Sequence, residues 1–153
     1  MKEWLQKIYD ANLRDFGDLP ADRLLSLTIY AEARGESRQG KIAVGSVILV
    51  RVDHRSWDGN TIKEVCLWPV QFSCYLPKDP NRLMLMNIAD TWDEEIKKNP
   101  VLQECLEIAQ GLISGTLERY PLALDYFNPK VCHPEWAATK TLVAEIGNHQ
   151  FYT

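Results

Sequence analysis

Residues 24–52 read LLSLTIYAEARGESRQGKIAVGSVILVRV, and this segment sets the expected architecture. Proline suits a first helical turn and aspartate can cap exposed amides, so Pro20 and Asp22 predict a helix that begins just before it. Apolar residues then recur at helical spacing. We expect this helix to run to about Arg34 and to stop at Gly35.

The second half of the segment, residues 41–52, is rich in apolar residues. Its β-branched content favours a strand, whereas a dozen unbroken residues favour a helix that is buried on most sides. We predict a helix. Gly45 costs it about 1 kcal/mol in helix propensity but would let a neighbouring helix approach closely.

Further helices are predicted on both sides of this segment. They cover residues 3–14, residues 60 or 61 to 68, a short stretch opened by a Thr91–Glu94 capping box, and residues 99–114, with Leu102, Leu106, Ala109 and Ile113 on one face. Residues 69–90 contain Asp79-Pro80-Asn81, which is typical of a turn, and we predict a long loop there.

The C-terminal fifth of the chain changes character. Residues 122–127 are predicted to form a strand and residues 134–137 a single helical turn. Residues 142–146 and 150–153 flank Gly147-Asn148, which is typical of a β-hairpin turn. The expected fold class is therefore α+β, a predominantly helical body with a small antiparallel sheet near the C-terminus. We expect residues 1–153 to form one domain.

The composition excludes several classes of function. A net charge of −4 with dispersed basic residues argues against a nucleic-acid partner, which calls for a clustered cationic face. The longest apolar stretch, residues 42–50, is too short to span a membrane. The N-terminus carries scattered charges where a secretory signal needs an apolar core, so we expect synthesis in a cytoplasm. The four cysteines lack metal-binding spacing and are expected to be free, buried thiols.

Familiar metal and nucleophile motifs are absent from the sequence. There is no HExxH, no serine in a GxSxG context and no glycine-rich phosphate loop, and the three histidines are isolated from one another. We therefore expect no metal and no cofactor. Carboxylates are left as the best candidates for chemistry.

Glu32 is the carboxylate in the most unusual surroundings. It shares one helical face with Leu25, Thr28 and Ile29, so it would project from a largely apolar flank in a last helical turn. Apolar surroundings and helix C-terminal carbonyls both raise the pKa of a carboxyl group, as a general acid requires. The alternative is a solvated glutamate, or one paired with Arg34.

Five blocks of the sequence resemble a known family and follow its order. They are Ala31-Glu-Ala-Arg-Gly-Glu36 with Gly40, residues 42–52, Asn60-Thr-Ile-Lys-Glu-Val65, Gln71-Phe-Ser73, and a closing block of Tyr126-Phe-Asn-Pro129, Pro134-Glu-Trp-Ala137 and Ile146-Gly-Asn-His-Gln-Phe151. Together they span about residues 24–152 and resemble the SleB/CwlJ-type cell wall hydrolase domain, known from spore-cortex-lytic enzymes and phage-encoded wall hydrolases.

The resemblance implies a lysozyme-like fold that cleaves peptidoglycan glycan strands between N-acetylmuramic acid and N-acetylglucosamine. It assigns the catalytic acid to Glu32 and a structural or groove-shaping role to Glu36. Further substrate-binding positions follow from the same resemblance: Gln71, Phe72 and Ser73 opposite the acid, and Tyr126 and Asn128 on a strand that faces the cleft. For Phe72 and Tyr126, core packing is as good an interpretation as sugar stacking.

Two mechanisms remain open. A lytic transglycosylase needs one carboxyl group, because the muramic acid 6-hydroxyl is the internal nucleophile, and the resemblance favours this route. Hydrolysis needs a second carboxylate. Its candidates are Asp125, which stands where many family members carry histidine or an aromatic residue, Asp79 and Glu36.

The rival hypotheses are a peptidoglycan-binding domain without turnover, a wall amidase or peptidase, and an interaction protein in a spore or virion shell. As an enzyme, the chain is expected to act as a monomer on the wall without a signal peptide. It would be released as a phage endolysin or stored in a spore layer.

Overall fold

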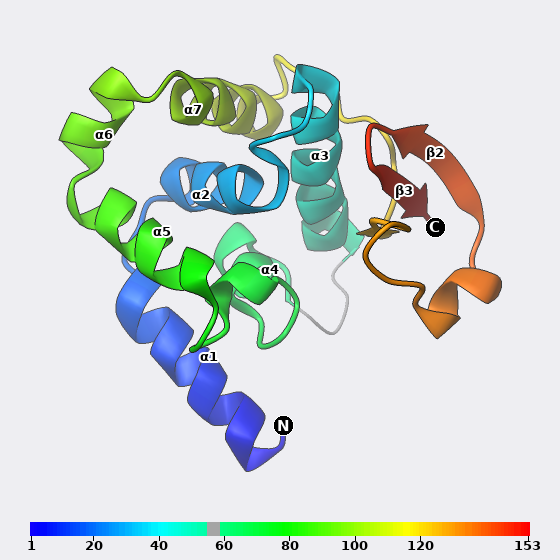
Figure 1. The fold of residues 1–153 in the computed structure, drawn as a ribbon, viewed down its shortest axis with the longest axis horizontal. Helices are drawn as coiled ribbons and strands as arrows, with labels where there is room; N and C mark the ends of the chain where they lie inside the picture. Colours follow the sequence, from blue (N-terminus) through cyan, green and yellow to red (C-terminus); the bar gives the residue numbers. More distant parts are fainter. Residues whose placement is uncertain (55–58) are drawn as a thin grey trace.

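The computed structural model describes residues 1–54 and 59–153. Within these residues the chain forms seven α-helices, two short 3-10 helices and one antiparallel sheet (Figure 1). The helices are α1 (Glu3–Phe16), α2 (Ala21–Ala33), α3 (Arg38–His54), α4 (Ile62–Leu67), η1 (Ser73–Tyr75), α5 (Pro80–Asp90), α6 (Trp92–Lys98), α7 (Pro100–Ser114) and η2 (Glu135–Ala138). The strands are β1 (Asp125–Phe127), β2 (Leu142–Ile146) and β3 (His149–Tyr152).

Helix α2 is the central helix of the body. It packs against α7, α3, α4 and α5, whereas α1 lies at the edge and contacts α4 (Figure 1). Helix α3 also contacts β1 and β2, so it joins the helical body to the sheet. The expected α+β architecture, with a small sheet near the C-terminus, is confirmed.

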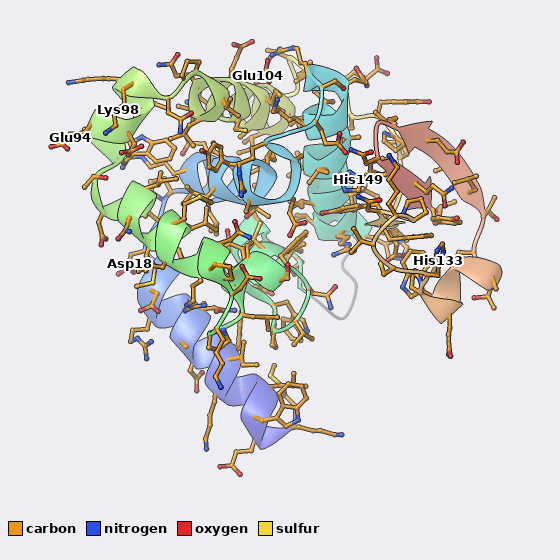
Figure 2. All side chains as sticks on the ribbon, in the orientation of Figure 1. Asp18, Glu94, Lys98, Glu104, His133 and His149 are labelled. Carbon is orange, nitrogen blue, oxygen red and sulfur yellow. The ribbon has the colours of Figure 1, made fainter. Side chains whose placement is uncertain are left out.

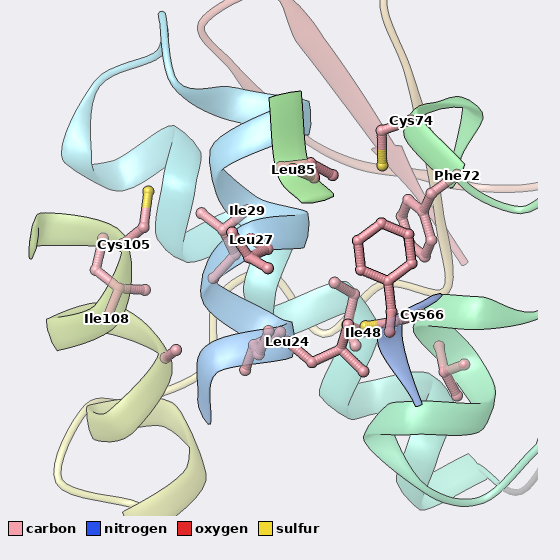
Figure 3. Close-up of a cluster of buried hydrophobic side chains, with 14 of the residues drawn as sticks. Leu24, Leu27, Ile29, Ile48, Cys66, Phe72, Cys74, Leu85, Cys105 and Ile108 are labelled. Atoms are coloured by element: carbon pink, nitrogen blue, oxygen red, sulfur yellow. The ribbon is translucent and has the colours of Figure 1, made fainter. Parts of the chain in front are cut away.

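The core explains why α2 is helical along its whole length. Leu24, Leu27 and Ile29 are fully buried, and they meet side chains such as Ile48 from α3 and Ile108 from α7 (Figure 3). The polar side chains of this helix are satisfied locally, because buried serine and threonine hydroxyls donate to carbonyls four residues back. Burial on most sides, not amphipathicity, therefore stabilises α2.

The predicted helix over residues 41–52 is confirmed, and it begins three residues earlier than expected, at Arg38. Gly45 is the point of closest approach to its neighbours. A Cβ atom built there would lie 2.7 Å from the Leu112 Cδ1 atom of α7 and 2.9 Å from the Ile29 Cδ1 atom of α2. The absence of a side chain thus allows α3 to cross both helices closely, as the sequence indicated.

Three helices begin at side-chain caps. Thr61 accepts a hydrogen bond from the Glu64 amide, Asp79 accepts one from the Asn81 amide, and Asn99 accepts one from the Leu102 amide. In α5 and α7 the cap is followed by proline at the first helical position, where no amide is needed.

The prediction of a long loop over residues 69–90 is wrong. The Asp79-Pro80 pair starts helix α5 instead of a turn, and η1 precedes it. A capping aspartate followed by proline is common to turns and to helix starts. Leu85 and Ile88 are buried in the core, and their packing decides in favour of the helix.

Two further details of the predicted helices are wrong. Thr91 precedes α6 but does not cap it, because its hydroxyl donates to the Asn87 carbonyl of α5. Asp22, by contrast, accepts a hydrogen bond from the Arg23 amide in the first turn of α2, as the sequence predicted, although Pro20 occupies the N-cap position. The buried face of α7 also differs from the expected one, since Ile113 is exposed and Leu112 is buried.

The sheet has the strand order β1-β3-β2, and both pairs are antiparallel. The predicted hairpin at Gly147-Asn148 is confirmed. Of the strand predicted over residues 122–127, only β1 forms. Its three residues pair with β3, beginning with Asp125 opposite Tyr152. Phe151 and Ala123 bury this sheet against α3.

Two sequence-based expectations concern the cysteines and the membrane. All four cysteines are free, and three are buried, but Cys132 is exposed, so the expectation of buried thiols is wrong there. Among the described residues, no helix combines the length and the apolar character that a bilayer span requires.

Candidate active site

A cleft of about 440 Å³ opens between the end of α2, the segment before η1 and the start of the sheet. Its lining residues come from segments far apart in the sequence. They are Glu32, Arg51, Val70, Gln71, Phe72, Ser73, Tyr126, Phe127, Asn128, Val131, Cys132 and His149. Of the predicted site residues, the structure therefore gathers Glu32, Gln71, Phe72, Ser73, Tyr126 and Asn128 around one cleft, whereas Glu36 does not line it.

Glu32 is largely buried in the last turn of α2, and its carboxyl group lines this cleft. Burial raises its pKa from 4.5 to about 7, because desolvation disfavours the charged form. Three smaller effects act on the same group. The hydroxyl of Tyr126 donates to Oε2 at 3.2 Å and lowers the pKa, the charge of Asp79 raises it, and the charge of Arg51 lowers it. The carboxyl group can therefore keep its proton at a pH close to neutral.

The end of α2 keeps the neighbouring arginine away from this carboxyl group. The Arg34 guanidinium donates to the Tyr30 and Ala31 carbonyls at the end of the helix and to the Asn81 side chain on α5. The alternative in which Glu32 pairs with Arg34 is therefore excluded by the structure.

Gln71, Phe72 and Ser73 line the cleft together with Glu32. Phe72 belongs to the hydrophobic core as well, since only 3% of its surface is exposed. The guanidinium of Arg51 lies 5.7 Å from the centre of the Phe72 ring and donates to the Gln71 side-chain oxygen at 3.4 Å. For Phe72, core packing is thus confirmed, with one part of the residue facing the cleft.

Tyr126 and Asn128 reach the cleft from β1 and from the turn after it. The Tyr126 ring packs edge-on against His149 at 5.0 Å and lies 5.6 Å from the Phe151 ring. The Asn128 side chain accepts a hydrogen bond from the Lys130 amide, and its carbonyl accepts from Val131. Tyr126 is therefore held by packing, and Asn128 shapes the loop that borders the cleft.

Glu36 lies four residues beyond Glu32 and binds the β2–β3 turn. Its carboxylate accepts hydrogen bonds from the backbone amide and the side-chain amide of Asn148. The Lys41 ammonium donates to the Glu36 carbonyl, which fixes the start of α3. This position matches the structural role that the sequence suggested for Glu36.

Asp125, the departure from the family pattern, is held by two cations. It accepts a hydrogen bond from Arg51 at 3.4 Å and forms an ion pair with Lys140. Asp79, another candidate for a second carboxylate, is engaged in capping α5. Neither residue lines the cleft.

Sequence reasoning missed six of the residues that line the cleft, and Arg51 and His149 are the two of these that contact the predicted ones most directly. Arg51 is the more predictable one, because it is a cation in a helix buried on most sides, and a buried guanidinium needs partners. It donates to the Leu124 carbonyl at 2.7 Å as well as to Asp125. His149 has no such signal, since only the hairpin pairing carries it to the cleft.

A helical body with a small antiparallel sheet across a cleft from one buried glutamate defines the class of the protein, a lysozyme-like domain. Residues 35–152 match the family model described as Cell Wall Hydrolase. The chain therefore belongs to the Cell Wall Hydrolase family. The match begins three residues after Glu32, so the role of that residue depends on the geometry described above.

Curated relatives include spore cortex-lytic enzymes of Bacillus species. The enzyme of Bacillus cereus is 28% identical over 136 residues, which cover 84% of this chain and 42% of the relative. The enzyme of Bacillus subtilis (strain 168) is 26% identical, with 84% and 36% covered. The chain thus spans about two fifths of the length of the curated relatives that it matches.

Two solved structures have a similar fold. The catalytic domain of the germination-specific lytic transglycosylase SleB from Bacillus anthracis has a TM-score of 0.60 and 26% identity, over 90% of this chain and 98% of that domain. The catalytic domain of the Bacillus cereus SleB protein has a TM-score of 0.59 and 26% identity, over 87% and 89%.

Proposed function

We propose that this chain cleaves peptidoglycan glycan strands between N-acetylmuramic acid and N-acetylglucosamine, as a lytic transglycosylase with Glu32 as general acid and base. The observation that carries the proposal is a carboxyl group with a pKa of about 7 that lines a cleft. A general acid works best when its pKa lies near the working pH, because it then holds its proton and still releases it readily.

The reaction transfers one proton from Glu32 to the substrate and one proton from the substrate back to Glu32. Glu32 donates its proton to the glycosidic oxygen, and the bond from that oxygen to the muramic acid C1 atom breaks. The muramic acid 6-hydroxyl oxygen then bonds to C1, and its proton passes to the Glu32 carboxylate. The product is a 1,6-anhydro end, no water is consumed, and Glu32 returns to its starting protonation state.

The state of Asp125 favours this route over hydrolysis. Glycosidases that hydrolyse their substrate normally use a second carboxylate, either as the nucleophile or to activate water. Asp125 is occupied by Arg51 and Lys140 and lies outside the cleft lining, and Asp79 caps a helix. A mechanism with one free carboxyl group fits this arrangement.

The remaining lining residues are assigned to substrate binding. Gln71, Ser73 and Asn128 offer polar groups to the hydroxyl and acetamido groups of the sugars, Tyr126 offers aromatic surface, and Phe72 supports the wall of the cleft from the core. Glu36 acts indirectly, through the hairpin that it holds. We propose a monomer that binds no nucleic acid, in keeping with the net charge of −4.

Mass spectrometry of the fragments released from purified sacculi tests this function. Soluble muropeptides with 1,6-anhydromuramic acid ends are the expected products. Reducing muramic acid ends would mean hydrolysis, and free stem peptides would mean an amidase or peptidase. Binding to sacculi without release of fragments would leave only a peptidoglycan-binding domain, and the proposal would then be wrong.

A further inference from the structure

The segment from Glu32 to Glu36 carries two carboxyl groups with different surroundings. The first lines the cleft, and the second reaches across to the hairpin of the sheet. The Glu36 carboxylate accepts a hydrogen bond from the Asn148 amide at 3.1 Å and one from its side chain at 3.3 Å. One short stretch of chain therefore connects the proposed acid with the sheet on the other side of the cleft.

Gly147 makes this close contact possible. Its φ of 57° lies in the left-handed region, and a Cβ atom built there would come within 2.8 Å of the Glu36 Oε2 atom. A larger residue would therefore strain the turn and collide with the carboxylate. The hairpin turn is shaped to receive Glu36.

The next residue after this turn is His149, at the start of β3. Figure 2 shows it at the boundary between the helical body and the sheet. Its side chain is only 10% exposed, its Nδ1 atom lies 3.3 Å from the Glu36 Oε1 atom, and the same residue lines the cleft. The Glu36 carboxylate therefore borders the imidazole ring on one side.

The His149 ring in turn contacts Tyr126. The two rings meet edge to face, with centroids 5.0 Å apart and an interplanar angle of 73°. Phe151 lies 5.6 Å from the same tyrosine ring. The Tyr126 hydroxyl then donates to the Oε2 atom of Glu32 at 3.2 Å. A continuous series of contacts leads from Glu36 through His149 and Tyr126 to Glu32.

We propose that His149, which packs between Glu36 and Tyr126, is a positioning residue that fixes the Tyr126 ring so that its hydroxyl donates to Glu32 and orients the acid in the cleft. The inference rests on the proposed function for its consequence in catalysis, but the positioning itself is a property of the free protein. A carboxyl group that is misaligned by a fraction of an ångström transfers its proton less effectively.

The packing of the imidazole ring, not its charge, carries this role. Burial lowers the pKa of His149, although the facing charge of Glu36 raises it, so the ring is largely neutral at neutral pH. The charged and titratable groups that act on the series are Glu36 on His149, Asp79 and Arg51 on Glu32, and Arg51 and Cys74 on Tyr126. We therefore expect the His149→Phe variant to keep the positioning role, because phenylalanine can make the same edge-to-face contact with Tyr126.

The first test is the titration of the Glu32 carboxyl carbon by ¹³C NMR in the free protein. Tyr126→Phe removes the donor that stabilises the charged carboxylate, so the Glu32 pKa should rise above its wild-type value. His149→Ala should also raise the Glu32 pKa, and His149→Phe should leave this pKa unchanged. The Tyr126→Phe/His149→Ala double variant should titrate like Tyr126→Phe alone, because both changes act through one hydrogen bond.

The second test is the pH profile of glycan cleavage on purified sacculi. The protonated form of Glu32 is the active acid, so the cleavage rate falls above the Glu32 pKa. This alkaline limb of the pH profile should move to higher pH in His149→Ala and stay in place in His149→Phe. The maximal rate of His149→Ala should fall by about three- to tenfold, an expectation for a displaced catalytic group. A residue with only a structural role would not move the limb.

These tests separate the inference from the proposed function. A wild-type Glu32 titration in His149→Ala, or a shift in the double variant equal to the sum of the single shifts, overturns the positioning role whether or not the protein cleaves glycans. Loss of cleavage activity in the wild type would instead overturn the proposed function. If His149→Ala does not fold, His149→Leu gives the same comparison, because it keeps the bulk without the aromatic edge.

Discussion

The end of α2 and the start of β1 each carry one carboxyl group, and the two differ in what surrounds them. Among residues 1–54 and 59–153, Glu32 has no ion pair, and it is buried beside a tyrosine hydroxyl. Asp125 is held between the cations of Arg51 and Lys140. Burial without a cation favours the protonated form of a carboxyl group.

The different surroundings of Glu32 and Asp125 indicate which carboxyl group can act on a glycan. A general acid must be protonated and must reach the substrate, and Glu32 meets both conditions. A nucleophile or base must be charged and free to approach the sugar, but Asp125 is bound by two cations and lies outside the cleft lining. The contrast between the two residues supports chemistry that depends on a single carboxyl group.

The largest expected effect comes from removing the carboxyl group of Glu32, which abolishes its difference from Asp125. Glu32→Gln keeps the size and the hydrogen bond to Tyr126 but has no proton to donate. Release of muropeptides from sacculi should fall by about 10²- to 10⁴-fold, the usual contribution of a general acid and base. Circular dichroism should show an unchanged fold. Full activity of this variant would remove Glu32 from the mechanism.

The same substitution should stabilise the protein at alkaline pH. The folded-state pKa of Glu32 is raised above its unfolded value, so wild-type stability is complete below about pH 4.5 and is lost as the pH rises through about 7. At pH 8 the Glu32→Gln variant should exceed the wild type by up to about 3 kcal/mol in the free energy of unfolding, and at pH 4 by little. Urea denaturation at both pH values measures this, and a pH-independent difference would contradict it.

The pH dependence of the wild-type rate should follow the protonated fraction of Glu32. Above about pH 7 the maximal rate of cleavage should fall by about tenfold for each pH unit, because each unit removes nine tenths of the remaining acid form. Initial rates of muropeptide release between pH 5 and 9 check this, at roughly constant ionic strength. A rate that is constant across the range would mean that another group donates the proton.

The smallest expected effect belongs to Asp125. Asp125→Asn is the matched control for Glu32→Gln, since each replaces one carboxyl group by the corresponding amide. The rate should fall by less than about tenfold, because this change disturbs only the contacts with Arg51 and Lys140. The products should keep their anhydro ends. A loss as large as that of Glu32→Gln would make Asp125 a second catalytic carboxylate.

The same contrast shows how far the sequence could predict this site. The position of Glu32 follows from local pattern, since an apolar helical face and a stop at Gly35 place it in a last helical turn. The family resemblance predicted Gln71, Phe72, Ser73, Tyr126 and Asn128, and the Gly147-Asn148 pattern predicted the hairpin. The cations around Asp125 did not follow from either source, because Arg51 and Lys140 reach it through tertiary packing over 74 and 15 residues of sequence.

The fold was also predictable where local signals agree and less so where they conflict. The cap-and-proline pair at Asn99 and the Gly147 turn were interpreted correctly. The equivalent pair at Asp79 predicts a turn just as well, because nothing local separates a turn from the start of a helix. Only the burial of Leu85 in the core separates them. Long-range packing is thus the information that a single sequence does not carry.

The most direct test of the central claim is the titration of the Glu32 carboxyl carbon in the wild-type protein, followed by ¹³C NMR from pH 3 to 9 with Glu32→Gln to assign the signal. The structure predicts a midpoint at about 7. A midpoint below about 5, the range of an ordinary solvated glutamate, would mean that the group has no proton to donate near neutral pH. The account of this cleft as a one-carboxyl glycan-cleaving site would then be contradicted.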